Sequence, residues 1–224
     1  MTKEEVLSRI RSFGLVPSIR VNSADLAIFA AENVLAGGIP IVEITNTIPE
    51  ADRAIRELTR NFPSLIVGAE VVNGLDEAHR HLDAGAMFIT GPGLDPGVAG
   101  YCIEQDIAVM PGALTPTEVM HAYRLGADLV KVVPCAEVGG AKYIRALKGP
   151  LPHVPLVAAG GVTQSTAAHF IMAGAAALGV GEDLIPRQAL RNREASWIRE
   201  LAGRFIKFVR EARSEMNPES SKRS

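Results

Sequence analysis

Short apolar runs recur along the chain, and segments with helical patterns separate them. Several of these runs are almost continuously apolar, which is typical of parallel strands whose two faces are both covered. Strands that alternate with helices pair in parallel, because each connection crosses back over the sheet. The pattern predicts eight strands: Leu15 to Val21, Ile39 to Thr45, Leu65 to Val72, Met87 to Gly93, Ile107 to Ala113, Leu129 to Pro134, Pro155 to Gly161 and Ala176 to Gly181.

The number of strand–helix units and the length of the chain together favour a closed barrel. Eight units in 224 residues match the usual size of one (β/α)8 barrel, so we expect an α/β fold with a single TIM barrel domain over residues 1–216. An extra helix over residues 2–12 is expected before the first strand, and a longer helix from about Glu194 to Arg213 after the last. The polar residues 217–224 are expected to form a disordered tail.

Composition changes this picture mainly by excluding classes of partner. Hydrophobic residues make up 47% of the chain and charged residues 21%, as in ordinary globular proteins. The formal net charge of −2 argues against a nucleic-acid partner, because such proteins carry a basic face for phosphates. The charged, amphipathic N-terminal segment lacks the apolar stretch of a signal peptide or membrane span, so we expect no membrane partner and a cytoplasmic location.

Metal and cofactor chemistry is weakly supported by the residue types that would carry it. Cys102 and Cys135 lie in separate segments, which favours small buried apolar residues over a disulfide or a thiolate zinc site. There is no glycine fingerprint for a dinucleotide after the first strand. We therefore expect no metal and no other cofactor. The five histidines fall mostly within or beside the predicted outer helices: His79, His81, His121, His153 and His169.

Ionisable residues interrupt several of the apolar strands. Arg20 lies in the first strand, Glu43 in the second, Glu70 in the third and Lys131 in the sixth, and Glu182 directly follows the eighth. Buried ionisable groups are costly unless they are paired or used. In a barrel the carboxyl ends of the strands converge on one mouth, where enzymes of this fold keep their active sites. The sequence therefore places candidate chemistry at that mouth.

Lys131 is the candidate nucleophile. It lies between Val130 and Val132, so strand alternation directs its side chain to the opposite face. If that face is the barrel interior, desolvation is expected to lower the pKa of the amine, and the free amine can attack a ketone. The alternative is a structural lysine paired with Glu43 or Glu70.

Glu43 is the candidate general acid/base. It lies within an apolar strand, where an unpaired carboxyl has a raised pKa and exchanges protons near neutrality. A lysine and such a glutamate form the minimum set for imine chemistry, since the lysine supplies the electron sink and the glutamate moves protons. As an alternative, Glu43 is a buried salt-bridge partner.

Two glycine-rich segments follow the seventh and eighth strands. Gly160-Gly161 and Gly179-Val180-Gly181 lie where many barrels hold phosphate on exposed backbone amides. The alternative is that they form tight turns. Glu182, beside the second segment, would repel a phosphate dianion.

Six collinear motifs lie between about Leu15 and Pro186: Ile41-Val42-Glu43-Ile44-Thr45, Val67-Gly68-Ala69, Met110-Pro111-Gly112, Thr115-Pro116-Thr117-Glu118, Val130-Lys131-Val132-Val133-Pro134 and Ala158-Ala159-Gly160-Gly161-Val162. Together they resemble the bacterial 2-keto-3-deoxy-6-phosphogluconate / 4-hydroxy-2-oxoglutarate aldolase family. The resemblance implies a class I aldolase on a (β/α)8 barrel, a homotrimer, that reversibly cleaves a 2-keto-4-hydroxy acid into pyruvate and an aldehyde.

The resemblance also implies roles for individual residues. Lys131 stands at the Schiff-base position and Glu43 at the general acid/base position. Arg20 matches an arginine that could hold the keto acid's carboxylate by a bidentate pair, and Pro92 matches a proline that lines the same pocket. The remaining expected substrate contacts are Thr45, Glu70, Gly160, Gly161, Gly181 and Glu182.

The chain departs from the family at positions that contact substrate. Glu70-Val71-Val72 replaces Gly-Thr-Val, Ala159 replaces a threonine, and Glu182 replaces a serine that helps to hold phosphate. Added carboxylates weaken the binding of an anion. We therefore expect an unphosphorylated 2-keto acid, or one whose amino or hydroxyl end binds Glu70 or Glu182.

Two other functions are compatible with the same residues. The first is a binding or regulatory relic of the aldolase fold, in which Lys131 is held between Glu43 and Glu70 and the two lost threonines mark lost chemistry. The second is a metal-free phosphosugar isomerase or epimerase, which Gly160-Gly161 supports and Glu182 opposes. Fold alone does not decide among these chemistries.

Overall fold

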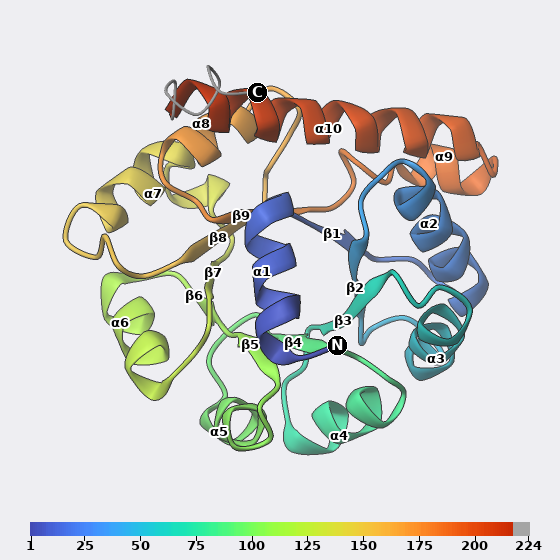
Figure 1. Cartoon of the computed structure of the whole chain (residues 1–224), viewed down its shortest axis with the longest axis horizontal. Helices are drawn as coiled ribbons and strands as arrows, with labels where there is room; N and C mark the ends of the chain where they lie inside the picture. The colour runs from blue at the N-terminus through green and yellow to red at the C-terminus, as the bar shows by residue number, and fades with distance from the viewer. Residues whose placement is uncertain (217–224) are drawn as a thin grey trace.

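The computed structural model describes residues 1–216, so the predicted tail over 217–224 lies outside the described residues. Its strands pair in parallel in the order β5-β4-β3-β2-β1-β9-β8-β7-β6. Because β5 and β6 are two halves of one chain segment, this order brings the sheet round into a nearly closed barrel (Figure 1). The strands are β1 Leu15–Ile19, β2 Ile41–Thr45, β3 Ile66–Glu70, β4 Phe88–Thr90, β5 Ala108–Met110, β6 Gly112–Ala113, β7 Val130–Val132, β8 Leu156–Ala159 and β9 Ala177–Val180.

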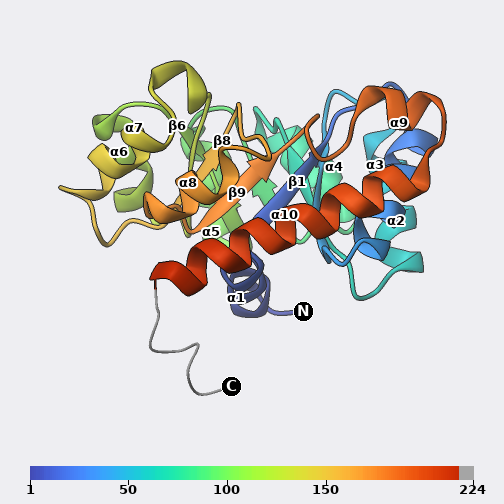
Figure 2. The same ribbon diagram turned by 90° about the horizontal axis from the view of Figure 1, so that it is seen from above.

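The helices form a ring around this barrel, with α10 running along one side of it (Figures 1 and 2). Their apolar faces and the outward-facing strand residues form one large buried core between the sheet and the helices. The helices are α1 Lys3–Phe13, α2 Ala24–Ala36, α3 Ala51–Asn61, α4 Leu75–Asp83, α5 Pro96–Glu104, α6 Pro116–Leu125, α7 Ala141–Lys148, α8 Ala167–Met172, α9 Arg187–Arg191 and α10 Ala195–Met216, with a 3-10 turn η1 at Ala136–Val138.

The predicted barrel is confirmed, and each of the eight predicted runs contains a strand. The fifth run is divided at Pro111, which has no backbone N–H to donate to a neighbouring strand. The expected N-terminal helix begins at Lys3, where the Thr2 side chain accepts a hydrogen bond from Glu5 N and the Glu5 side chain accepts one from Thr2 N. The last helix runs slightly longer than expected, from Ala195 to Met216.

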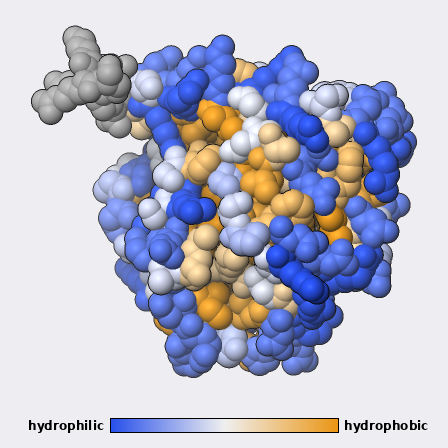
Figure 3. All heavy atoms as spheres, turned by 45° about the vertical axis from the view of Figure 1, so that its right-hand side comes forward, coloured by the Kyte–Doolittle hydropathy of each residue, from blue (hydrophilic) through white to orange (hydrophobic). Residues whose placement is uncertain are grey.

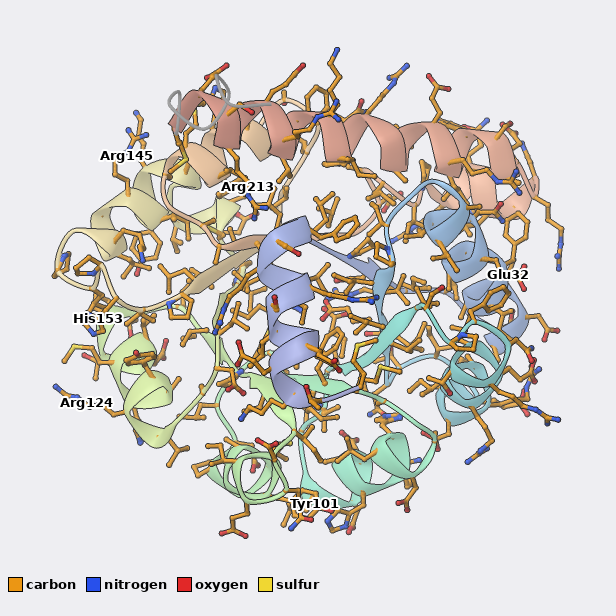
Figure 4. All side chains as sticks on the ribbon, in the orientation of Figure 1. Glu32, Tyr101, Arg124, Arg145, His153 and Arg213 are labelled. Atoms are coloured by element: carbon orange, nitrogen blue, oxygen red, sulfur yellow. The ribbon has the colours of Figure 1, made fainter. Side chains whose placement is uncertain are left out.

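Helix α1 closes one end of the barrel. It lies across the amino ends of the strands (Figures 1 and 2), where its buried residues pack on the first inward-facing strand residues. Arg213 of α10 holds this helix in place: its guanidinium donates to the carbonyls of Ser12, Arg11 (2.7 Å) and Ala176 (3.0 Å), and Figure 4 shows it beside one end of α1. The members of this closed-end cluster are Val6, Leu7, Ile10, Val16, Ile41, Ile66, Phe88, Ala108, Met110, Leu129, Val157 and Ala177.

Among residues 1–216, the exposed large hydrophobic side chains are Met1, Leu75, Leu125 and Met216. On the face shown in Figure 3, polar residues surround apolar atoms that gather near its centre. None of the helices within residues 1–216 combines the length and the apolar composition that a bilayer span requires.

Candidate active site

Strand alternation brings the candidate nucleophile into the barrel. Val130 and Val132 of β7 belong to the core between the sheet and the helices, so Lys131 between them points inward, as predicted. The residue is 4% exposed. Its side chain therefore lies among the inward-facing residues of other strands and not among the helices.

The Lys131 amine lies between two carboxylates. Its Nζ donates to Glu43 Oε1 at 2.6 Å and to Glu70 Oε1 at 2.9 Å, with Thr90 Oγ1 at 3.5 Å. Burial lowers the pKa of Lys131, but the charges of Glu43 and Glu70 outweigh burial and raise it above its usual value. The predicted net lowering of this pKa was wrong, because the amine is paired with both carboxylates, as in the alternative of a lysine paired with Glu43 or Glu70.

Glu43 is fully buried, with no exposed surface. Its carboxylate accepts hydrogen bonds from the hydroxyls of Ser18 and Thr90, the latter at 2.9 Å. Burial, followed by the negative charge of Glu70, raises the pKa of Glu43 to about 7 despite the opposing effect of Lys131. Glu43 can therefore hold or release a proton near neutral pH next to the amine.

Glu70 connects the lysine to Arg20. Arg20 donates from Nε to Oε2 at 3.1 Å and from Nη2 to Oε1 at 2.7 Å, while the Thr45 hydroxyl donates to Oε2 at 3.0 Å. Burial raises the pKa of the Glu70 carboxyl, but the positive charges of Lys131 and Arg20 hold it well below its usual range. The guanidinium expected to bind a substrate carboxylate is thus already paired with a carboxylate of the protein.

A cavity of about 420 Å³ opens onto this group of residues at the carboxyl ends of the strands. Lys131 and Glu70 lie at its inner end, while Glu43 and Thr45 are buried behind them and do not line it. The amine is therefore ion-paired but reachable. The lining residues are Ser18, Arg20, Glu70, Lys131, Val133, Pro134, Ala159, Gly160, Gly161, Val162, Gly179, Gly181, Glu182, Asp183, Ile185 and Arg187.

The Gly160-Gly161 pair forms a turn that also lines the cavity. Both residues have positive φ, +80° and +78°. A Cβ at Gly160 would lie 2.9 Å from the Cα of Pro134, and one at Gly161 would overlap the Cβ of Ala136. The two glycines therefore form a tight turn, as the alternative interpretation predicted. Because they also line the cavity, they remain available to a ligand.

The other expected contacts lie at the rim or outside the cavity. Gly181 and Glu182 line the outer part, where the Glu182 side chain is 63% exposed and pairs with Arg187 at 3.2 Å. Pro92 instead lines a neighbouring cavity of about 350 Å³ with Gly112 and Val133. The structure therefore brings the strand residues together but places Pro92 apart from them.

Sequence reasoning missed the two hydroxyls that bind Glu43. Ser18 lies two residues before Arg20 in the first strand, and Thr90 two residues before Pro92 in the fourth. Strand alternation counted from Arg20 and Pro92 could have identified both, because residues two apart share a strand face. Small hydroxyl residues fit an apolar strand well, so composition gives no signal for them.

No group of three or more His, Cys, Asp or Glu side chains within residues 1–216 is arranged to hold a metal ion. Cys102 and Cys135 are buried, as predicted, and burial raises the pKa of each thiol to about 11. Neither thiol lines the cavity.

Comparison with known proteins gives concordant matches over most of the chain. The family model for KDPG and KHG aldolase matches residues 6–201. The 2-dehydro-3-deoxy-phosphogluconate aldolase of Treponema pallidum is 26% identical over 92% of this chain and 96% of its own length. The KHG/KDPG aldolase of Escherichia coli is 29% identical over 84% of this chain and 88% of its own length.

A solved structure extends the likeness to the fold. The KDPG aldolase of Legionella pneumophila, with pyruvate captured as a covalent carbinolamine intermediate, has a TM-score of 0.82 and 27% identity. The match covers 88% of this chain and 96% of the Legionella protein.

Proposed function

The chain belongs to the KDPG and KHG aldolase family of class I aldolases, and from this we propose that Lys131 is its Schiff-base nucleophile and Glu43 its general acid/base. One observation carries this assignment: the Lys131 amine lies 2.6 Å from a fully buried carboxyl whose pKa is raised to about 7, at the inner end of an open cavity. Such a pair exchanges a proton without help from solvent.

Glu43 would accept a proton from Lys131 and so produce the free amine, which burial alone does not produce. As Lys131 attacks the C2 carbonyl of a 2-keto acid, its proton moves to Glu43, and a carbinolamine forms. Protonation of the carbinolamine hydroxyl by Glu43 releases water and leaves an iminium. These transfers run along a hydrogen bond already present between the two side chains.

Cleavage then uses the iminium as an electron sink. Loss of the proton from the C4 hydroxyl breaks the C3–C4 bond, the aldehyde departs, and the electron pair moves through C3 to form an enamine. Protonation at C3 regenerates the iminium, and addition of water releases pyruvate and the lysine amine. We assign these proton transfers to Glu43 as well, because Ser18 and Thr90 hold its carboxyl beside the reacting nitrogen.

Reductive trapping tests the assignment. Borohydride with pyruvate is expected to add the mass of a reduced pyruvate imine irreversibly at Lys131, detected by intact-protein and peptide mass spectrometry. Lys131→Ala should abolish the adduct while keeping the fold by circular dichroism. An unlabelled wild-type protein would instead support the binding relic, for which the double ion pair of Lys131 is the structural argument.

We further propose an unphosphorylated substrate. Both oxygens of Glu70 are occupied by protein donors, which leaves Glu182 and its neighbour Asp183 as the lining carboxylates that meet the distal end of the substrate. Their charge opposes a phosphate dianion. Cleavage of 4-hydroxy-2-oxoglutarate should be much faster than cleavage of 2-keto-3-deoxy-6-phosphogluconate, and the reverse ranking would refute the proposal.

The trimer is the assembly that the family resemblance implies, and the cytoplasm is the location that the sequence predicts. We propose a cytoplasmic homotrimer. Light scattering coupled to size exclusion should give three times the subunit mass of 23.8 kDa, and a monomer mass would contradict it. Fractionation of cells that express the protein tests the location.

A further inference from the structure

Glu70 has four side-chain hydrogen bonds, and its carboxylate is the centre of the ion-pair group. Arg20 holds it through two nitrogens, Thr45 donates to one oxygen, and Lys131 donates to the other. A bidentate guanidinium–carboxylate pair is among the stronger contacts that side chains make. The barrel mouth therefore already contains one carboxylate bound in the manner that a substrate carboxylate would be.

The place that a 2-keto acid's carboxylate must take is set by covalent structure. That carboxylate is bonded to the carbonyl carbon which the amine attacks, so it has to lie close to Lys131 Nζ. Among the described residues, the other cations that line the cavity are Arg20 and Arg187. Arg187 pairs with Glu182 at the rim, whereas Arg20 and Lys131 share one oxygen of Glu70. Arg20 is thus the cation at the required position.

We propose that Glu70 is an internal competitor for the substrate carboxylate: it occupies Arg20 and Lys131 in the free enzyme, and a 2-keto acid binds by displacing it from Arg20. This proposal rests on the function proposed above for Lys131. It makes Glu70 a specificity-determining residue that the family resemblance does not supply, since the family has glycine there.

The two partners differ in their freedom to move, which indicates how the exchange occurs. The Arg20 side chain is 61% exposed, whereas that of Glu70 is 3% exposed. The backbone after Glu70 is fixed in an unusual conformation, because Val71 has a φ of +62° and Val72 N donates to Thr90 O at 3.2 Å. Arg20 is therefore the partner that turns to the substrate, while Glu70 keeps Thr45 and Lys131.

The consequence is selection for carbonyl compounds that carry a carboxylate. A neutral ketone has no group to replace Glu70 on Arg20, so it gains no contact with the guanidinium and the ion-pair group stays closed. A 2-keto acid offers Arg20 a new carboxylate, although it has to compete with one already in place. Glu70 thus lowers affinity for the true substrate and excludes adventitious carbonyls.

The test is the concentration of pyruvate that gives half-maximal reductive labelling of Lys131. Glu70→Gln removes the charge with little change in size, and we expect it to lower this concentration about tenfold, which corresponds to loss of one charged competitor. Glu70→Ala provides a second variant should the glutamine rebind Arg20. Glu211→Gln, on the exposed side of α10, is the matched control and should behave like the wild type.

A double-mutant cycle with Arg20→Gln tests whether the effect of Glu70→Gln depends on Arg20. In that background Glu70→Gln should lower the half-saturating pyruvate concentration by less than in the wild type, because no guanidinium remains to compete for and only the effect through the charge on Lys131 is left. With neutral hydroxyacetone as the probe, the effect of Glu70→Gln should be the same in both backgrounds, since it acts only through the charge on Lys131.

The possible outcomes distinguish the competitor role of Glu70 from the Schiff-base role of Lys131. Labelling of Lys131 in the wild type, with an unchanged or higher half-saturating concentration in both Glu70 variants, overturns the competitor role and leaves the Schiff-base assignment standing. An equal effect of Glu70→Gln on pyruvate with and without Arg20 overturns it too. No labelling in any of these folded proteins overturns both proposals.

Discussion

The two ends of the barrel interior are built from the same strands and serve opposite purposes. In β2, Ile41 belongs to the closed-end cluster, and Glu43, two residues later on the same face, lies in the ion-pair group at the mouth. The closed end is covered by α1 and packed with apolar side chains, whereas the mouth opens into a cavity. Alternation decides which residues face inward, and their chemistry decides what each end does.

The closed end and the mouth also contribute differently to the free energy of folding. Burial of apolar area at the closed end favours folding directly. At the mouth, Lys131, Glu43 and Glu70 are taken out of water, and their mutual attraction has to offset a desolvation cost of several kcal/mol per ion. The closed end therefore stabilises a mouth whose arrangement serves proton transfer.

The largest expected effect is at the mouth. Glu43→Gln removes the proton carrier but keeps its shape, so kcat for cleavage of 4-hydroxy-2-oxoglutarate should fall about 10²–10⁴-fold. Stability should change far less, because Glu70 still pairs with Lys131. Coupled detection of pyruvate and urea unfolding measure the two quantities. Retention of wild-type kcat would remove Glu43 from the mechanism.

At the closed end we expect a large loss of stability with retention of labelling at Lys131. Phe88→Ala empties a fully buried ring site and should cost about 3–5 kcal/mol of unfolding free energy. Reductive labelling of Lys131 by pyruvate should persist below the new melting temperature, because the catalytic groups are retained. If this variant stays folded but loses labelling, the closed end and the mouth are coupled and do not serve separate purposes.

The mouth, unlike the closed end, should make a contribution to stability that depends on pH. Burial raises the pKa of Glu43 to about 7 from an ordinary value of 4.5, so between these pH values the native state keeps a proton that the unfolded chain releases. Stability from this group is therefore present at low pH and declines as pH rises, by up to about 3 kcal/mol, with no further change above the native pKa.

The difference between wild type and Glu43→Gln isolates this contribution. Urea unfolding at a series of pH values should show the two curves approaching or crossing between pH 4.5 and 7. Phe88→Ala should give a curve parallel to that of the wild type, since it changes no titrating group. Parallel curves for Glu43→Gln would show that its pKa is not raised.

Sequence patterns predicted the barrel and the inward position of Lys131 because both follow from alternation and chain length. They failed for the pKa of Lys131, which depends on Glu43 and Glu70, residues 88 and 61 positions away. Distances between strands depend on barrel closure and register, and local sequence does not contain them. The position of Pro92 beside a different cavity has the same cause.

The smallest expected effect lies where the two ends meet. Gly68 of β3 is inward-facing, and a Cβ added there would overlap the ring of Phe88. Gly68→Ala should therefore cost about 1–3 kcal/mol of unfolding free energy by overpacking. In the background of Phe88→Leu, whose side chain is smaller, Gly68→Ala should cost less, and urea unfolding of the four proteins measures the interaction. An equal cost in both backgrounds would show that the ring does not set the limit at Gly68, so the closed-end packing would stop short of the layer that contains Glu43.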